Sequence, residues 1–179
     1  MSYTLKENEI VFAKIRETAI VPSKKLEDAG YDLYANFEED YFVIEPGKTR
    51  AVPTGIATAF SSKYYIQIEE RSSMAKLGVK KSGGVFDSGY RGEYFIMLYN
   101  TNKKPFVISK VAVEDLADEF EINGVKYNKQ EVIVYPYTKA IAQALVIPVP
   151  KTEVEEISYE ELMKIPSERG MGMIGSSNK

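Results

Sequence analysis

Short segments in which apolar and polar residues alternate recur along this chain, and they constrain its fold more than any other feature. Turn-forming residues separate them, as in Glu45–Lys48, where Pro-Gly favours a turn with Pro46 at its first central position. The clearest segments are Ile10–Ile15, Tyr41–Ile44, Arg50–Val52, Gly55–Phe60, Tyr64–Ile68, Tyr94–Tyr99, Val132–Tyr135 and Ile141–Ile147. Many short strands in such a series predict an all-β sandwich, jelly roll or barrel.

Two short segments are typical of helices instead. The apolar residues of 113–120 fall near one helical face, and Ser158–Glu161 has the capping-box pattern of a helix start. Between them, Asn123-Gly124 is typical of a two-residue hairpin turn. We therefore expect an all-β fold that carries one or two short helices.

Composition limits the classes of function. The chain has 179 residues, of which 44% are hydrophobic and 27% are charged, and this balance favours one globular domain. A net charge of −3 argues against general binding of nucleic acid. No apolar run approaches the roughly 20 residues of a membrane span, and the N-terminal residues lack a signal-peptide pattern. We therefore expect a cytoplasmic protein that binds neither nucleic acid nor membrane.

Two chemically versatile residue types are missing, because the sequence has no Cys and no His. Thiol nucleophiles, disulfides and zinc–thiolate sites are thereby excluded, and so is the most common general base. An enzyme built from this chain would use Asp or Glu as its base. Electrophilic assistance would come from Arg, Lys, Ser, backbone N–H groups or a hard cation bound by oxygens. These groups suit phosphate chemistry.

The glycine-rich run Gly83–Glu93 holds one carboxylate, Asp87, between two segments that read as short strands. Glycine permits positive φ and lets a ligand approach the main chain closely. The run therefore predicts a pocket built largely of backbone, with Asp87 directed into it. The alternative is an ordinary hairpin with a solvated Asp at its turn.

A second cluster, Arg71-Ser72-Ser73, follows a predicted strand and combines a guanidinium group with two hydroxyls. Such a combination at the entrance to a turn favours the binding of an oxyanion. In the alternative interpretation, Arg71 pairs with Glu69 or Glu70 and the serines cap a helix at Met74.

Two further segments carry charges beside glycine. Asp32, within Ala29–Leu33, has a carboxylate that could help to hold a hydrated Mg²⁺, although a turn-forming Asp is the plainer interpretation. Arg169–Ser177 places an arginine beside a run of glycine and serine, and a tail of this kind can close over a phosphate chain. The alternative for the tail is a frayed, solubilising terminus.

Taken in order, five segments resemble the motif series of the trimeric dUTPase family: Ala29–Leu33, Arg71–Ser73, Gly84–Glu93, Ile141–Gln143 and Arg169–Ser177. The resemblance extends over residues 29–177, nearly the whole chain. It implies a jelly-roll or β-clip fold and a homotrimer whose sites each draw on more than one subunit. It also implies Mg²⁺-dependent hydrolysis of dUTP to dUMP and pyrophosphate.

The resemblance also implies how the nucleoside and the water are bound. Asp87 would orient and deprotonate the water that attacks the α-phosphorus. Tyr90 would lie against the deoxyribose and leave no room for a 2′-hydroxyl. Backbone groups of Gly84, Val85 and Phe86 would read the edge of uracil, and mismatched buried polar groups would make the rejection of cytosine strong.

For the triphosphate, the resemblance implies a larger set of contacts. Asp32 would reach the metal through water, and Ile174 would cover the base. The phosphates would be bound by Arg71, Ser72, Ser73, Gln143, Arg169, Gly175 and Ser176.

Three departures from the family pattern stand out. Thr138–Ala140 replaces the usual Gly-Asp-Arg, and Ile174 replaces an aromatic residue whose stacking on a base would contribute about 1–3 kcal/mol. Extra chain, about 109–137, resembles an insertion that some phage members carry. We therefore expect a β domain over 1–166, with this insertion, and a flexible lid over 167–179.

Two other functions stay open at this point. A dCTP deaminase shares the fold and similar motifs, but its catalytic glutamate would fall at Met97 here. A regulatory or binding protein with this fold would instead engage a protein partner through 109–137.

Overall fold

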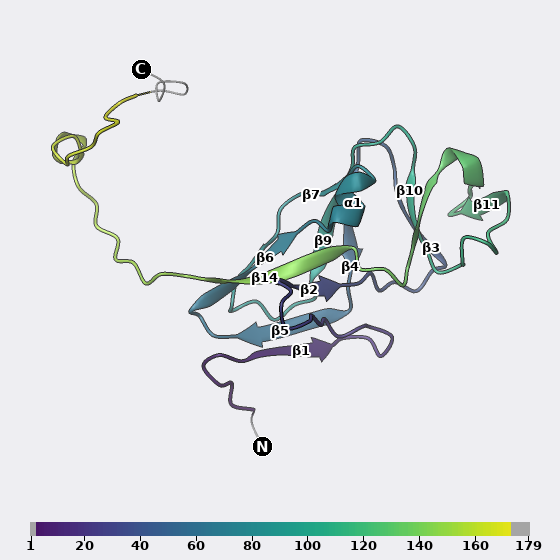
Figure 1. Cartoon of the computed structure of the whole chain (residues 1–179), viewed down its shortest axis with the longest axis horizontal. Helices are drawn as coiled ribbons and strands as arrows, with labels where there is room; N and C mark the ends of the chain where they lie inside the picture. The colour runs from purple at the N-terminus through teal and green to yellow at the C-terminus, as the bar shows by residue number, and fades with distance from the viewer. Residues whose placement is uncertain (1–2, 173–179) are drawn as a thin grey trace. The chain divides into compact units, whose positions relative to one another are not determined.

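The computed structural model describes residues 3–172 of the 179-residue chain. Two compact units make up the chain, Met1–Val149 and Pro150–Lys179. All the strands belong to the first unit (Figure 1). The predicted boundary between a domain ending at 166 and a lid over 167–179 stays a prediction.

The regular secondary structure of the first unit consists almost entirely of short strands. They are β1 (Ile10–Lys14), β2 (Gly30–Leu33), β3 (Tyr41–Ile44), β4 (Thr49–Pro53), β5 (Ile56–Phe60), β6 (Tyr64–Glu69), β7 (Val79–Lys81), β8 (Val85–Phe86), β9 (Phe95–Asn100), β10 (Phe106–Ser109), β11 (Glu119–Ile122), β12 (Val125–Asn128), β13 (Ile133–Pro136) and β14 (Ala142–Pro148). Helix α1 (Ser72–Lys76) and the 3₁₀ turn η1 (Lys129–Glu131) lie among them, and α2 (Tyr159–Leu162) belongs to the second unit. Each strand segment predicted from alternation overlaps one of these strands.

The strands form small sheets whose neighbours are distant in the sequence. A four-stranded sheet has the order β2-β14-β6-β8, and two three-stranded sheets have the orders β4-β9-β7 and β13-β10-β3. The pairs β1-β5 and β11-β12 stand as two-stranded sheets. All pairings are antiparallel except that of β10 with β13. The predicted all-β fold with short helices is confirmed.

One main hydrophobic core lies between the sheets, and alternation along the strands directs side chains into it. In β9, Ile96 and Leu98 are buried while Phe95, Met97 and Tyr99 are exposed. Strands β5 and β6 contribute Ile56, Phe60, Ile66 and Ile68 in the same way. Successive strand residues point to opposite faces, so this pattern is what a half-buried strand requires.

The run Gly83–Glu93 does not form the hairpin that its two apolar segments suggest. Strand β8 pairs with β6, whereas β9 pairs with β4 and β7 in another sheet. The N–H of Tyr94 donates to the carbonyl oxygen of Ile56 at 2.9 Å, and this bond directs the chain away from β8. Asp87 therefore lies on a crossover between two sheets.

The predicted helix over 113–120 is wrong, because residues from Glu119 onward form β11 of a hairpin. Positive φ at Asn123 (51°) and Gly124 (80°) confirms the predicted two-residue turn. That turn aligns Phe120 with Tyr127, whose rings stack at 6.0 Å between centroids. Lys129 binds the carbonyl oxygens of Val113 and Leu116, which a helix would have used internally.

Helix α2 confirms the second helix prediction. Both bonds of the capping box are present between Ser158 and Glu161. In the described part of the chain, no helix has the length and apolar character needed to span a membrane.

Candidate active site

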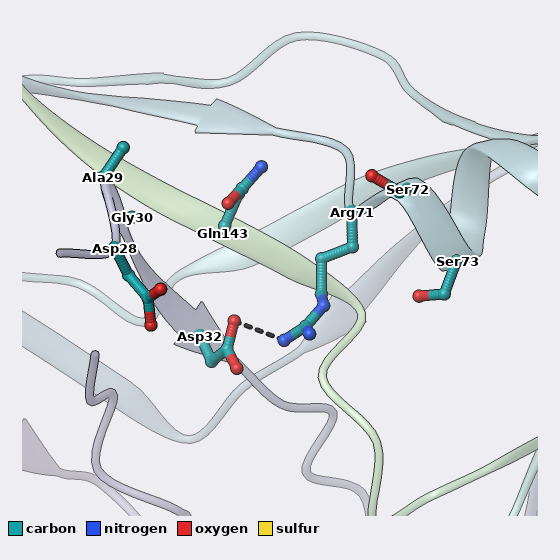
Figure 2. Close-up of a pocket in the computed structure, with 8 residues that line it drawn as sticks. All are labelled: Asp28, Ala29, Gly30, Asp32, Arg71, Ser72, Ser73 and Gln143. Carbon is teal, nitrogen blue, oxygen red and sulfur yellow. Dashed lines mark ion pairs between the residues drawn. The ribbon is translucent and has the colours of Figure 1, made fainter. Parts of the chain in front are cut away.

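A cavity of about 300 Å³ opens at one end of the four-stranded sheet, and residues from separate segments line it (Figure 2). Asp32 comes from β2, Gln143 from β14, and Ser72 and Ser73 from α1. The full lining is Asp28, Ala29, Gly30, Asp32, Arg71, Ser72, Ser73 and Gln143. The structure therefore brings together five residues that the sequence marked as candidates in three separate motifs.

Strand register explains this convergence. In the antiparallel pairing, Gln143 lies opposite Asp32 on β2 and opposite Glu69 on β6. Residues directly opposite one another share a face of the sheet and lie close together. Because β6 ends at Glu69, the chain then turns and presents Arg71 at the same end of the sheet.

Arg71 forms an ion pair with Asp32, drawn as the dashed line in Figure 2. The alternative pairing of Arg71 with Glu69 or Glu70 is not observed, because both of those glutamates are bound to Lys81. Glu69 pairs with the ammonium group at 3.1 Å, and Glu70 accepts from the backbone N–H at 3.1 Å. The side chains of Arg71 and Asp32 are 36% and 34% exposed, so the pair is accessible to an incoming anion.

The two serines begin α1 rather than capping it. Arg71 occupies the N-cap position without a capping bond from its side chain, and the helix starts at Ser72. Both serine side chains are exposed and line the cavity. The interpretation of these serines as caps for a helix at Met74 is therefore wrong.

Gln143 is held in place from two sides. Its side-chain amide donates to the carbonyl oxygen of Glu70 at 3.0 Å. On the other side lies Gly30, where a Cβ atom would sit 3.0 Å from Cβ and 3.1 Å from Oε1 of Gln143. Glycine at position 30 thus leaves the room that this glutamine side chain occupies.

Sequence reasoning missed Asp28, whose carboxyl group is a second acidic group on the cavity wall. The signal was weak, because Asp28 directly precedes Ala29-Gly30 and looks like part of a turn. It does form such a turn, since its Oδ2 accepts from the N–H of Lys25 at 3.0 Å.

The glycine-rich run lines a second cavity of about 220 Å³, which Gly83, Gly84, Val85 and Phe86 form with Ile68 and Phe95–Met97. No residue lines both cavities. Asp87 and Tyr90 line neither of them. Asp87 is exposed, and the Tyr90 hydroxyl donates to the carbonyl oxygen of Glu93 at 3.0 Å.

Comparison with known proteins decides the family. The family model described as dUTPase matches residues 16–113. A deoxyuridine 5′-triphosphate nucleotidohydrolase of Nautilia profundicola is 31% identical over 170 residues, which cover 93% of this chain and 96% of that protein. The chain belongs to the dUTPase family. The predicted family membership is thus confirmed.

Two further proteins are similar to this chain, one in sequence and one in fold. The Pol polyprotein of caprine arthritis encephalitis virus is 41% identical over 101 residues, which are 56% of this chain but only 9% of the polyprotein. A dUTPase of Staphylococcus bacteriophage 80alpha has the same fold, with a TM-score of 0.71 at 21% identity, over 95% of this chain and 98% of that one. The predicted jelly-roll or β-clip fold of dUTPases is confirmed.

The last dUTPase motif of the chain lies in the second unit. Arg169 is exposed, and its Nε donates to the carbonyl oxygen of Gly172 at 3.1 Å. The predicted lid residues Ile174, Gly175 and Ser176 lie outside the described residues.

Proposed function

We propose that this protein hydrolyses dUTP to dUMP and pyrophosphate, with Asp87 activating the attacking water. The observation that carries the proposal is the cavity in which Asp32, Arg71 and Gln143 meet the two serines of α1. Membership of the dUTPase family supports the same reaction.

The cavity is suited to phosphate groups. Arg71 presents a guanidinium fork, which binds phosphate through two parallel hydrogen bonds, and Ser72 and Ser73 add hydroxyl groups. In this structure Arg71 is paired with Asp32, whose side chain is partly exposed. An exposed ion pair contributes only about 0–1 kcal/mol to stability. Exchange of Asp32 for a phosphate on Arg71 therefore costs little.

Mg²⁺ fits the acidic side of this cavity. The ion typically keeps several waters and takes one or two carboxylates together with the phosphates of its substrate. Asp32 and Asp28, which both line the cavity, would supply those carboxylates, with Asp32 acting through water. Within residues 3–172, no group of three or more acidic residues forms a cage made of protein alone, which agrees with an ion bound mainly to the triphosphate. When bound, the ion would neutralise phosphate charge.

Asp87 is our choice of general base, since the chain has no His, this carboxylate is exposed, and it directly follows Phe86, which lines the second cavity. It would take a proton from the water as the water oxygen bonds to the α-phosphorus. The bond from the α-phosphorus to the oxygen that bridges to the β-phosphorus would break. Its electron pair would leave with pyrophosphate.

Uracil would enter the second cavity, which Gly84, Val85 and Phe86 help to line, and their backbone groups would read its edge. Tyr90 would lie against the deoxyribose and exclude a 2′-hydroxyl. Since backbone groups carry fixed donors and acceptors, a base with the reversed pattern would leave them unpaired, at a cost of about 1–3 kcal/mol for each group.

A complete site needs both cavities, yet no residue lines both of them. We call the first cavity, which Arg71 and the two serines line, the phosphate cavity. We therefore propose a homotrimer in which the phosphate cavity of one copy is completed by the turn that carries Asp87 in another copy. Arg169 would clamp the γ-phosphate as the tail closes, with Gly175 and Ser176 adding contacts and Ile174 covering the base.

The decisive experiment measures pyrophosphate release from dUTP, dTTP, dCTP and UTP by the wild-type protein and by Asp87→Asn. We expect release from dUTP alone. In Asp87→Asn turnover should fall by about 10²–10⁴-fold, the usual contribution of a positioned base, while nucleotide binding persists.

Asp115→Asn is the matched control, because it makes the same change at an exposed position in the insertion and should leave turnover unchanged. Full activity of Asp87→Asn would refute the assigned base. Ammonia released from dCTP would instead indicate a deaminase.

A further inference from the structure

Three aromatic rings surround the turn that carries Asp87. The ring of Phe86 stacks on that of Tyr94, with centroids 3.9 Å apart and planes within 9°. Tyr90 completes the group, its centroid 6.2 Å from that of Tyr94 and 6.0 Å from that of Phe86. Phe86 directly precedes Asp87 and Tyr90 follows it by one turn, so Tyr94 contacts the residues on both sides of the proposed base.

Tyr94 is itself anchored to β5. Its side chain is fully buried, and its hydroxyl shares a hydrogen bond of 2.6 Å with Oγ1 of Thr58, which is 3% exposed. Its backbone N–H donates to Ile56 at 2.9 Å, and its carbonyl oxygen accepts from Oγ1 of Thr54 at 2.7 Å. Burial raises the pKa of the Tyr94 hydroxyl, so this group stays protonated and able to donate at neutral pH.

The turn over residues 87–93, between Phe86 and Tyr94, is held mainly by hydrogen bonds within itself. The N–H of Tyr90 donates to Asp87 at 3.1 Å, and Arg91 donates to the carbonyl oxygen of Ser88 at 2.6 Å. At its far end, the Glu93 carboxylate accepts from the N–H of Gly55 at 2.7 Å. Phe86 is also tied to the core through the pairing of β8 with β6, and the ring of Tyr94 is the contact that joins Phe86 and Tyr90 to one buried side chain.

We propose that Tyr94 is a positioning residue: its buried ring, fixed by Thr58, sets where Phe86 and Tyr90 stand and hence how closely the sugar fits. The inference rests on the proposed function, in which Tyr90 excludes the 2′-hydroxyl. Releasing the ring should widen the space beside Tyr90. Discrimination between dUTP and UTP should then fall more than turnover of dUTP.

The test compares Tyr94→Phe, Thr58→Val and the double variant. Each single variant leaves one buried hydroxyl without its partner, which destabilises the fold, whereas the double variant replaces both partners with apolar groups and should recover most of the lost stability. The hydrogen bond between Tyr94 and Thr58 is absent in all three variants. We expect the ratio of kcat/KM for dUTP to that for UTP to fall about 3–10-fold, the range that one net hydrogen bond covers.

A second measurement does not depend on activity. Amide hydrogen exchange of residues 86–92, without nucleotide, should be faster in the double variant than in the wild type. The control is Ile108→Val, which alters a fully buried side chain on β10 and should lower stability without changing either readout.

The outcomes separate the inference from the proposed function. An unchanged nucleotide ratio or unchanged exchange in the double variant would overturn the positioning role of Tyr94. Failure of the wild-type protein to hydrolyse dUTP would overturn the proposed function, and exchange of 86–92 would then decide the positioning role alone.

Discussion

Gly84 determines how closely β8 can approach β6 at the second cavity. Its φ is +143°, a backbone conformation that residues with a side chain rarely adopt. A Cβ atom at this position would lie 2.9 Å from Cβ of Ile68, and the Gly84 carbonyl oxygen accepts from the N–H of Ile68 at 2.7 Å. Conformation and space therefore both require glycine where the proposed uracil site begins.

We expect Gly84→Ala to lower the free energy of unfolding by about 1–3 kcal/mol, because the new methyl group must push Ile68 aside or strain the backbone. Binding of dUMP should weaken as well. Urea denaturation and calorimetric titration measure the two effects.

Gly83→Ala is the matched control for this prediction. Its φ of +93° also disfavours a side chain, but nothing lies within 4 Å of the added Cβ. Equal losses of stability in the two variants would contradict a steric role for Gly84.

Among single residues, the sequence predicted five residues that line the first cavity, Asp32, Arg71, Ser72, Ser73 and Gln143, but neither Asp28 nor the contacts between them. Arg71, Ser72 and Ser73 were recognisable as candidates because a guanidinium group beside two hydroxyls favours an oxyanion, and because the cluster falls in order within the dUTPase motif series. The ion pair between Arg71 and Asp32 depends on how β2, β14 and β6 align, and a sequence contains no local signal for that alignment. Where Asp87 acts stays a prediction from the motif.

At the level of elements, period-two alternation predicted strands well and their partners poorly. Alternation shows that one face of a strand is buried, but it carries no information about which strand pairs with its edge. Strand β8 illustrates the limit, because its two residues pair with β6 although β9 is nearer in the sequence. The helix predicted over 113–120 failed for a related reason, since stacking of Phe120 on Tyr127 favours the hairpin.

Tyr127 of the β11–β12 hairpin donates a hydrogen bond to Glu45, which precedes β4. This contact predicts that the stability of the protein depends on pH in the alkaline range. Burial, with the hydrogen bond to Glu45 at 2.6 Å, raises the pKa of Tyr127 from 10.0 to about 12. A pKa raised in the folded state gives stability that is complete below the unfolded value and is lost as pH rises through the folded value. The free energy of unfolding should therefore fall between pH 10 and about 12.

In Tyr127→Phe, the fall in the free energy of unfolding that comes from Tyr127 should be absent. Urea denaturation across the same pH range would detect this. Tyr99→Phe, on the exposed face of β9, is the control and should retain it. If the free energy of unfolding falls with pH in the same way for the wild-type protein and for Tyr127→Phe, the prediction is contradicted.

The role of 109–137 as a surface for a protein partner stays a prediction.

For the whole molecule, the two cavities have no lining residue in common, and the proposed trimer with shared sites rests on this observation. We expect Asp87→Asn, which lacks the proposed base, and Arg71→Ala, which lacks the proposed phosphate-binding group, to be nearly inactive. Mixing these two variants tests whether sites are shared between copies. If they are, some mixed trimers contain a site with both wild-type groups, and random assembly at equal amounts should restore roughly a quarter of wild-type activity.

The mixture is unfolded and refolded together, so that copies of the two variants assemble at random. Each variant refolded alone is the control and should stay inactive. If the co-refolded mixture is no more active than its components, each site lies within a single copy.

Strand β6 lies between β14 and β8, with the phosphate cavity at its end and the Asp87 crossover beside it. In the proposed trimer, these two sides of one strand serve different active sites. A defect in β6 would therefore be dominant, because one faulty copy would impair its own phosphate cavity and also the site of a healthy neighbour. Activity in a cell that makes both forms of the protein would fall faster than the share of faulty copies.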